Sequence, residues 1–220
     1  GSVPGVKVYE QSLKSIQDTE YMVKLREQFR NGERPSGCQS CWQEEDVGKT
    51  SKRQNSIYKM KTSLTDWTPD SEPTLKYIDF KLGNVCNLKC RICGSWSSSK
   101  WAQEEIDYET AKGGDNPLAR KQLKEGGWPK KNPQFFEELQ EDLKYVEYFE
   151  FTGGEPFMIK DHFKILMHCV EKGYAKNIDI HYNTNGTQLP PQEIFDLWSC
   201  FKHVEVAFSI DDVGEPFEYQ

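Results

Sequence analysis

The chain has 220 residues, of which 36% are hydrophobic and 13% are aromatic, and its formal net charge is −7 at pH 7. Its 6 tryptophans and 12 phenylalanines exclude a disordered protein, because disordered chains contain few aromatic residues. No apolar run approaches the ~18 residues that cross a bilayer, and no charged-then-apolar leader opens the chain, so we expect neither a membrane protein nor a secreted one. The acidic balance also disfavours nucleic acid as a partner.

The first part of the chain, residues 1–73, is predicted to be an appendage of helices and loops with little core of its own. Asp18-Thr19 can cap a helix that Asn31-Gly32 can end. A pair of cysteines, Cys38 and Cys41, follows. The next stretch, Lys49–Lys61, is basic and contains no acidic residue; we interpret it as a solvated loop or face, with phosphate binding as the alternative.

From residue 74 to residue 220 the pattern predicts an α/β domain. Apolar and polar residues alternate, as they do in strands, in four segments: 75–82, 145–151, 178–182 and 204–210. The helices between them are expected to begin at Asn132-Pro133, Asp161 and Pro190-Pro191. The polar stretch 94–131 is expected to hold a short helix and an excursion. Strands that alternate with helices predict a parallel sheet.

Each predicted strand ends in a loop rich in glycine, asparagine, cysteine or acidic residues. These loops are Gly83–Cys86, Gly153–Pro156, Asn183–Gly186 and Ser209–Asp212. In parallel α/β folds, ligands bind at the carboxyl ends of the strands. Four such loops at one edge of a sheet therefore predict a single binding site.

The chain contains 7 cysteines, an odd number in closely spaced groups. This is a poor framework for disulfides and indicates metal binding in a reducing compartment, so we expect a cytoplasmic protein. Cys86, Cys90 and Cys93 are separated in a way that lets one loop hold three corners of a [4Fe–4S] cluster. Zinc, held by these thiolates and a distant histidine such as His181, is the alternative. Zinc prefers paired C-x-x-C knuckles, which favours the cluster.

These motifs resemble those of a known family. Cys86-Asn-Leu-Lys-Cys90-Arg-Ile-Cys93 matches the CxxxCxxC signature of radical S-adenosylmethionine (SAM) enzymes, and it follows a first strand as theirs does. Phe151–Pro156 resembles their GGEP loop, and Thr184–Thr187 and Phe208–Asp211 resemble the ends of their third and fourth strands. The resemblance covers residues 74–220. The N-terminal segment, with Cys38-Gln-Ser-Cys41-Trp, is similar to the region before the barrel in SPASM/twitch-type members.

The resemblance implies a role for each of these loops. Cys86, Cys90 and Cys93 would each hold one iron of a [4Fe–4S] cluster, and the open fourth iron would bind the amino and carboxylate groups of SAM. Because Gly153 and Gly154 lack side chains, the backbone there could approach the SAM ammonium, with Glu155 as a further acceptor. The implied contacts to the ribose hydroxyls are Asn183, Asn185, Ser209 and Asp211, and Ile92 is the implied contact to the adenine.

The resemblance also implies a reaction. An electron from a reducing partner such as flavodoxin or ferredoxin would cleave SAM to methionine and a 5′-deoxyadenosyl radical, which abstracts hydrogen from a peptide, a protein or a small-molecule substrate. The alternatives are a radical SAM enzyme that modifies a nucleotide or nucleic acid, and a non-catalytic zinc or iron–sulfur module. Cys38 and Cys41 cannot fill a tetrahedral site alone, so they would supply half of a second cluster or zinc site that is completed from outside this chain.

The sequence departs from the family in the number of its strands. A radical SAM core resembles a partial (β/α)₆ barrel, whereas four strands are predicted before residue 220. We therefore expect a barrel truncated after about four strands, with the fourth strand as an open edge that a partner or another copy would cover. A barrel that is incomplete in this way can bind the cluster and still be inactive.

Overall fold

The computed structural model describes residues 11–60, 73–210 and 214 of the chain. The strands are β1 (Tyr77–Lys81), β2 (Tyr148–Thr152), β3 (Asp179–Thr184) and β4 (His203–Phe208). The helices before β1 are α1 (Leu13–Gln17), α2 (Glu20–Arg30), α3 (Gln39–Asp46) and α4 (Lys52–Lys59). The later helices are α5 (Ser99–Ala111), α6 (Pro117–Glu125), α7 (Trp128–Lys131), α8 (Pro133–Leu139), α9 (Phe163–Glu171) and α10 (Gln192–Trp198). None of the helices in the described ranges is long and apolar enough to cross a membrane.

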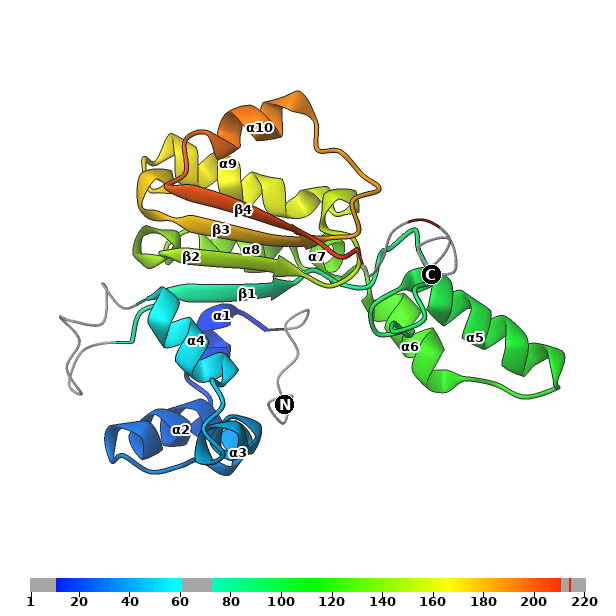
Figure 1. The fold of residues 1–220 in the computed structure, drawn as a ribbon, viewed down its shortest axis with the longest axis horizontal. Coiled ribbons are helices and arrows are strands. Elements are labelled where there is room, and N and C mark those ends of the chain that lie inside the picture. The colour runs from blue at the N-terminus through cyan, green and yellow to red at the C-terminus, as the bar shows by residue number, and fades with distance from the viewer. Residues whose placement is uncertain (1–10, 61–72, 211–213, 215–220) are drawn as a thin grey trace.

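The four strands form one parallel sheet in the order β1-β2-β3-β4. Each strand lies beside the next one in the chain, and the connections between them carry the helices (Figure 1). The predicted α/β fold with a parallel sheet, consistent with a partial barrel, is confirmed. Within the described residues β1 and β4 are the edges of this sheet, as expected for a barrel that does not close.

One face of the sheet carries the hydrophobic core. In β3, Ile180, Tyr182 and Thr184 are buried, while the residues between them are only half-buried. The cause is the alternation of side chains along a strand, which sends every second residue to the same face. Helices α8, α9 and α10 cover this face (Figure 1). Cys169 of α9 lies in the core, and burial raises the pKa of its thiol to about 12, so the thiol stays protonated.

The other face of the sheet is polar, and α4 lies against it. Asp79, Glu150, His181 and Glu205 lie in register across the four strands. The Nζ atom of Lys52, in α4, is 2.7 Å from Oε2 of Glu150 and 3.5 Å from Oδ2 of Asp79. Helix α4 is thereby fixed over β1 and β2, which explains why β2 is buried on both faces.

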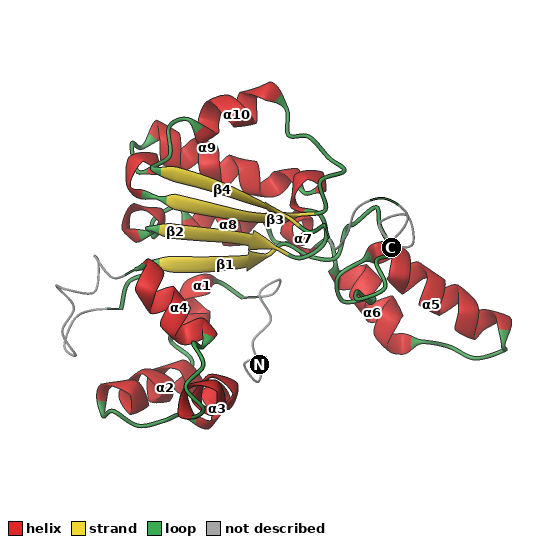
Figure 2. Cartoon of the chain, viewed as in Figure 1, coloured by secondary structure: helices red, strands yellow, loops and turns green. Residues whose placement is uncertain are grey.

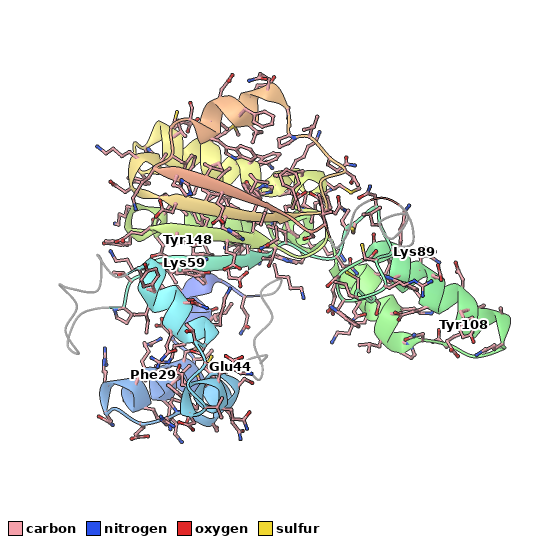
Figure 3. The ribbon with its side chains drawn as sticks, viewed as in Figure 1. Phe29, Glu44, Lys59, Lys89, Tyr108 and Tyr148 are labelled. Carbon is pink, nitrogen blue, oxygen red and sulfur yellow. The ribbon has the colours of Figure 1, made fainter. Side chains whose placement is uncertain are left out.

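A second lysine attaches the same helix to the sheet. Lys59 donates a hydrogen bond of 2.8 Å to the hydroxyl of Tyr148, and the two side chains meet between α4 and the sheet (Figure 3). Arg53 forms an ion pair with Glu45, at 2.7 Å between Nη2 and Oε2. Residues 52–59 of the basic stretch are therefore a helix rather than a loop, and its cations contact acidic and tyrosine side chains of this chain while Lys52 stays partly exposed.

The N-terminal part is helical, as predicted, and α2 is the one helix of this part whose position the sequence predicted. Thr19 caps α2 through its side chain, and the helix ends at Asn31 and Gly32 as predicted. Helices α1 to α4 contain no buried residue. Leu13 of α1 is partly buried against the core of the α/β domain. This segment is therefore held by surface contacts and by the lysines of α4.

Two details of the helical prediction are wrong. The stretch 94–131 holds three helices rather than one short one, and α5 and α6 form a hairpin that projects away from the sheet (Figure 2). Its buried residues are few, which explains the weak apolar pattern: α5 buries Ala102 and Ile106, and α6 buries Ala119. Asp161 does not cap α9, because it lies within a 3₁₀ turn, Lys160–His162, that precedes the helix.

Candidate functional site

The predicted site residues lie where the strands end at the carboxyl edge of the sheet. The cysteine loop follows β1, Gly153–Glu155 follows β2, Asn185 follows β3 and Ser209 follows β4. The register pairs Lys81 with Thr152 at the ends of β1 and β2. Because the strands are parallel, all four loops are presented at one edge, as the sequence predicted.

Cys86, Cys90 and Cys93 lie on one loop between β1 and α5, each partly exposed and none in a disulfide. Two side chains from the start of α5 hold the loop. The Ser98 hydroxyl donates to the carbonyl of Leu88 at 2.6 Å, and the Trp101 indole N–H donates to the carbonyl of Cys90 at 3.0 Å. The backbone N–H of Cys93 also donates to the Cys90 carbonyl, at 2.9 Å. Helix α5 thus fixes the course of the loop from outside.

Asn84 fixes the start of this loop, a role that the sequence analysis did not assign. The residue is buried, and its side-chain Nδ2 donates to the carbonyls of Ser95 at 2.8 Å and Gln122 at 3.2 Å. Its own carbonyl accepts from the Ser99 N–H at 2.6 Å. One asparagine therefore joins the strand end to both helices of the hairpin. In the sequence, the feature that points to this role is an asparagine, Asn84, directly after a glycine at the end of the predicted strand.

The two glycines of the GGEP motif pack against the backbone that leads into the cysteine loop. Both have a positive φ, +80° at Gly153 and +59° at Gly154. A Cβ atom at Gly154 would lie 2.4 Å from the carbonyl oxygen of Val85, and one at Gly153 would lie 2.9 Å from that of Gly83. The absent side chains thus make room for the chain just before Cys86. The role in approaching SAM remains a prediction beside this structural one.

Glu155, the acidic residue of the same motif, is completely buried. Its Oε1 accepts hydrogen bonds from the Thr184 hydroxyl at 2.8 Å and from the Phe157 N–H at 3.2 Å. Its Oε2 accepts from the backbone N–H of Asn185 at 2.8 Å. In addition, the Glu155 N–H donates to the Val85 carbonyl at 2.8 Å. Glu155 therefore connects the ends of β2 and β3 to the cysteine loop.

Asn185 brings the end of β3 to the first cysteine. Its Nδ2 lies 3.6 Å from the sulfur of Cys86 and 3.2 Å from Oδ1 of Asn87. The hydroxyl of Thr187, from the same loop, accepts a hydrogen bond of 2.9 Å from Nδ2 of Asn87. Asn87 and Thr187 were not among the predicted site residues, although both lie within the matched motifs.

The other predicted cofactor contacts are less closely grouped. Asn183 lies on the polar face of β3, where its Oδ1 is 3.4 Å from Nε2 of His181. Ile92 is 80% exposed between two of the cysteines, so it is available to a ligand. Ser209 is exposed, and its N–H donates to the Thr184 carbonyl at 2.8 Å. Asp211 lies outside the described residues.

The chemistry of the three cysteines fits a [4Fe–4S] cluster, whose usual ligands are thiolates. Among the residues that the structure describes, no three histidine, cysteine or acidic side chains are grouped so that they could hold one metal ion. His181 instead lies 3.0 Å from Oε2 of Glu205, through its Nδ1 atom. A [4Fe–4S] cluster binds each thiolate through a different iron. Three partly exposed cysteines on one loop supply the donor type that such a cluster takes.

The second cysteine pair lies apart from this edge, in the N-terminal helices. Cys38 is the N-cap of α3, and Cys41 lies in its first turn. The described ranges supply no third metal ligand beside them. Metal binding at this pair therefore stays a prediction.

A four-stranded parallel sheet with a three-cysteine loop at its carboxyl edge is consistent with a partial barrel of the α/β class. A sequence model of the radical SAM superfamily matches residues 80–216, which include this loop and all four strand ends. The chain belongs to the radical SAM superfamily. Members of this family generally bind a [4Fe–4S] cluster and SAM. No curated protein and no solved structure matches the chain.

Proposed function

We propose that this chain is a radical SAM enzyme that modifies a peptide or protein. When bound, the cluster and SAM supply the reductive cleavage of SAM and the abstraction of hydrogen from the substrate. The observation that carries the proposal is the joining of three strand ends at Cys86. Glu155 from the β2 loop holds Asn185 from the β3 loop, and Asn185 contacts the sulfur of Cys86.

The chain's own residues bind and orient the cofactors in this proposal. Cys86, Cys90 and Cys93 would each hold one iron. The loop after β2 keeps this cysteine loop in place through the contacts of Gly154 and Glu155 with Val85. The proposed ribose contacts are those predicted from the sequence: Asn183, Asn185, Ser209 and Asp211. Ile92 is the proposed contact to the adenine.

The choice of a peptide or protein substrate rests on the N-terminal segment. Its Cys38–Trp42 motif is similar to that of SPASM/twitch-type members, and this similarity supports the substrate class. A phosphate-binding role for the basic stretch has less support, because Lys52, Arg53 and Lys59 contact acidic and tyrosine side chains of this chain. The proposal includes a cytoplasmic location and an electron donor such as flavodoxin or ferredoxin.

The first test is the content of iron, sulfide and zinc per chain after anaerobic purification, in the parent and in Cys90→Ala. The matched control is Cys200→Ala, because Cys200 is exposed and lies outside the loop. We expect about four irons and four sulfides in the parent and in Cys200→Ala, and their loss in Cys90→Ala. About one zinc and no sulfide, even after reconstitution with iron, would identify a structural metal module and overturn the proposal.

The reaction and the substrate class need separate tests. SAM cleavage by the cluster-loaded chain, with dithionite as the reductant, tests the reaction class. Binding to RNA that weakens steeply with salt would favour a nucleic acid substrate over a peptide, because phosphate contacts release counterions. Absence of such binding is the result expected here.

A further inference from the structure

Asn185 is held in one orientation by the groups around it. Its Oδ1 accepts hydrogen bonds from the backbone N–H of Thr187 at 3.0 Å and from the hydroxyl of Thr187 at 2.7 Å. A backbone N–H can only donate, so the atom that faces it must be the amide oxygen. The amide nitrogen is then on the other side, toward Cys86. Since Oε2 of Glu155 also fixes the backbone of Asn185, neither the main chain nor the side chain is free to turn away.

The sulfur of Cys86 therefore has two N–H donors. One is Nδ2 of Asn185 at 3.6 Å, and the other is the backbone N–H of Leu88 at 3.4 Å. The Leu88 donor comes from the cysteine loop itself. The Asn185 donor comes from the end of a different strand, and only this donor can be removed by changing a side chain.

We propose that Asn185 raises the reduction potential of the cluster by donating a hydrogen bond to the Cys86 thiolate. This inference rests on the proposed function, because it requires a cluster on Cys86. Hydrogen bonds to the ligand sulfurs are one of the factors that set the potential of an iron–sulfur cluster. A donated N–H stabilises the reduced cluster more than the oxidised one, because reduction adds negative charge next to it.

This role is distinct from the ribose contact that the sequence suggests for Asn185. A ribose contact would matter only when SAM is bound, whereas the bond to sulfur is present without SAM. The two roles are therefore separated by measuring the potential of the cluster in the absence of SAM and the affinity for SAM separately.

The experiment is a redox titration of the cluster, followed by electron paramagnetic resonance, in the full chain without SAM. Two variants remove the donor: Asn185→Ala, and Asn185→Asp, which keeps the oxygen that accepts from Thr187. Gln188→Ala is the matched control, because Gln188 is on the same loop and its side chain donates to Thr187 and not to Cys86 within the described residues. Reduction is expected to become about tenfold less favourable in Asn185→Ala, a fall of 59 mV for a one-electron couple. In Asn185→Asp the fall should be larger, because the new carboxylate adds negative charge.

Three outcomes separate the inference about Asn185 from the proposed function. Unchanged potentials in both variants, with or without weaker SAM binding, would overturn the inference and leave the proposed function intact. If the parent assembles no cluster, it is the proposed function that fails. If only the variants fail to load iron, pulsed electron paramagnetic resonance on the reduced parent labelled with ¹⁵N-asparagine decides: coupling to a side-chain amide nitrogen supports the bond, and its absence overturns it.

Discussion

The buried carboxylate of Glu155 accepts a hydrogen bond of 2.8 Å from the backbone N–H of Asn185. The two residues end neighbouring strands, so the bond fixes the distance between two loops at the carboxyl edge of the sheet. A parallel sheet sets the spacing of the strands, but it does not set the path of the loops that follow them. In this protein the carboxylate of Glu155 fixes the path of these loops. It also accepts hydrogen bonds from Thr184 and Phe157.

Replacing Glu155 tests this role directly. In Glu155→Gln one carboxylate oxygen becomes an amide nitrogen, so a donor faces a donor in a buried position. We expect a loss of about 2 kcal/mol in the free energy of unfolding, and about 3 kcal/mol for Glu155→Ala, which leaves three donors without an acceptor. Urea denaturation measures both. Glu171→Gln is the control, since Glu171 is exposed at the end of α9; an equal loss there would contradict the buried network.

The glycines of the motif allow a matched comparison between two positions of similar backbone conformation. Gly154 and Gly173 have φ values of +59° and +73°, so alanine at either position carries the strain of a left-handed backbone, about 1 kcal/mol. A Cβ at Gly173 meets nothing within 4 Å, whereas one at Gly154 would lie 2.4 Å from the Val85 carbonyl oxygen.

We therefore expect Gly154→Ala to lose at least about 2 kcal/mol more than Gly173→Ala, because the extra methyl must displace packed backbone. If Gly154→Ala and Gly173→Ala have equal midpoints and slopes in urea, the loop before Cys86 moves at little cost and the expectation is wrong. Lower iron loading in Gly154→Ala alone would show that the displacement reaches the cysteine loop.

The strands and the site loops were predictable because their signals are local. Apolar alternation identified all four strands to within a few residues, and glycine, asparagine and cysteine after each strand marked the edge that binds ligands. A hydrophobic face such as that of β3 repeats every second residue, so it is visible without any knowledge of its partners.

The roles of α4 and Asn84 were not predictable in the same way. Lys52 contacts Glu150, 98 positions away in the chain, and nothing near Lys52 distinguishes it from an exposed lysine. Asn84 bonds to carbonyls whose positions depend on how α5 and α6 pack. In both cases the side chain is common at a surface, and only the tertiary structure shows what it contacts. The same is true of Glu155, which accepts hydrogen bonds from Thr184 and Asn185 at the end of another strand.

The anchoring of α4 can be tested through the pH dependence of Lys52→Met. Although burial raises it, hydrogen bonds from Lys52 and Tyr77 hold the pKa of Glu150 below its ordinary value. A carboxyl group whose pKa is lowered by folding contributes stability above its unfolded pKa, and this contribution is lost as the pH falls through the folded pKa.

We expect Lys52→Met to reduce the free energy of unfolding by about 1 kcal/mol at pH 7. The difference from the parent should shrink as the pH falls through the folded pKa of Glu150, which lies below 4.5, because a protonated Glu150 no longer needs a cation. Hydrogen exchange of α4 should also become faster. Lys49→Met serves as the control, since Lys49 is exposed. A difference that persists unchanged at low pH would show that Lys52 acts through packing of its methylene groups instead.

His162 gives the protein a second pH dependence, which comes from a base that is neutral in the folded state rather than from a carboxylate. The ring is fully buried, with Nδ1 2.5 Å from the carbonyl oxygen of Ile159 and Nε2 2.9 Å from the hydroxyl of Tyr182. Burial lowers the pKa of His162 to about 3, against the effect of the bond to Ile159. The folded chain therefore holds this histidine neutral, while the unfolded chain binds a proton below about pH 6.5.

Stability should consequently fall as the pH is lowered from 6.5 toward 3, by up to about 1.4 kcal/mol per pH unit from this residue, or about 2 kcal/mol at pH 5. Urea denaturation between pH 7 and pH 4.5 measures the slope. His162→Gln is expected to be less stable at pH 7, because it disturbs two buried bonds, but to lose stability less steeply with acid. His203→Gln changes an exposed histidine and retains His162, so its slope should match that of the parent. If His162→Gln kept the parent's slope, the acid sensitivity would have to come from other groups.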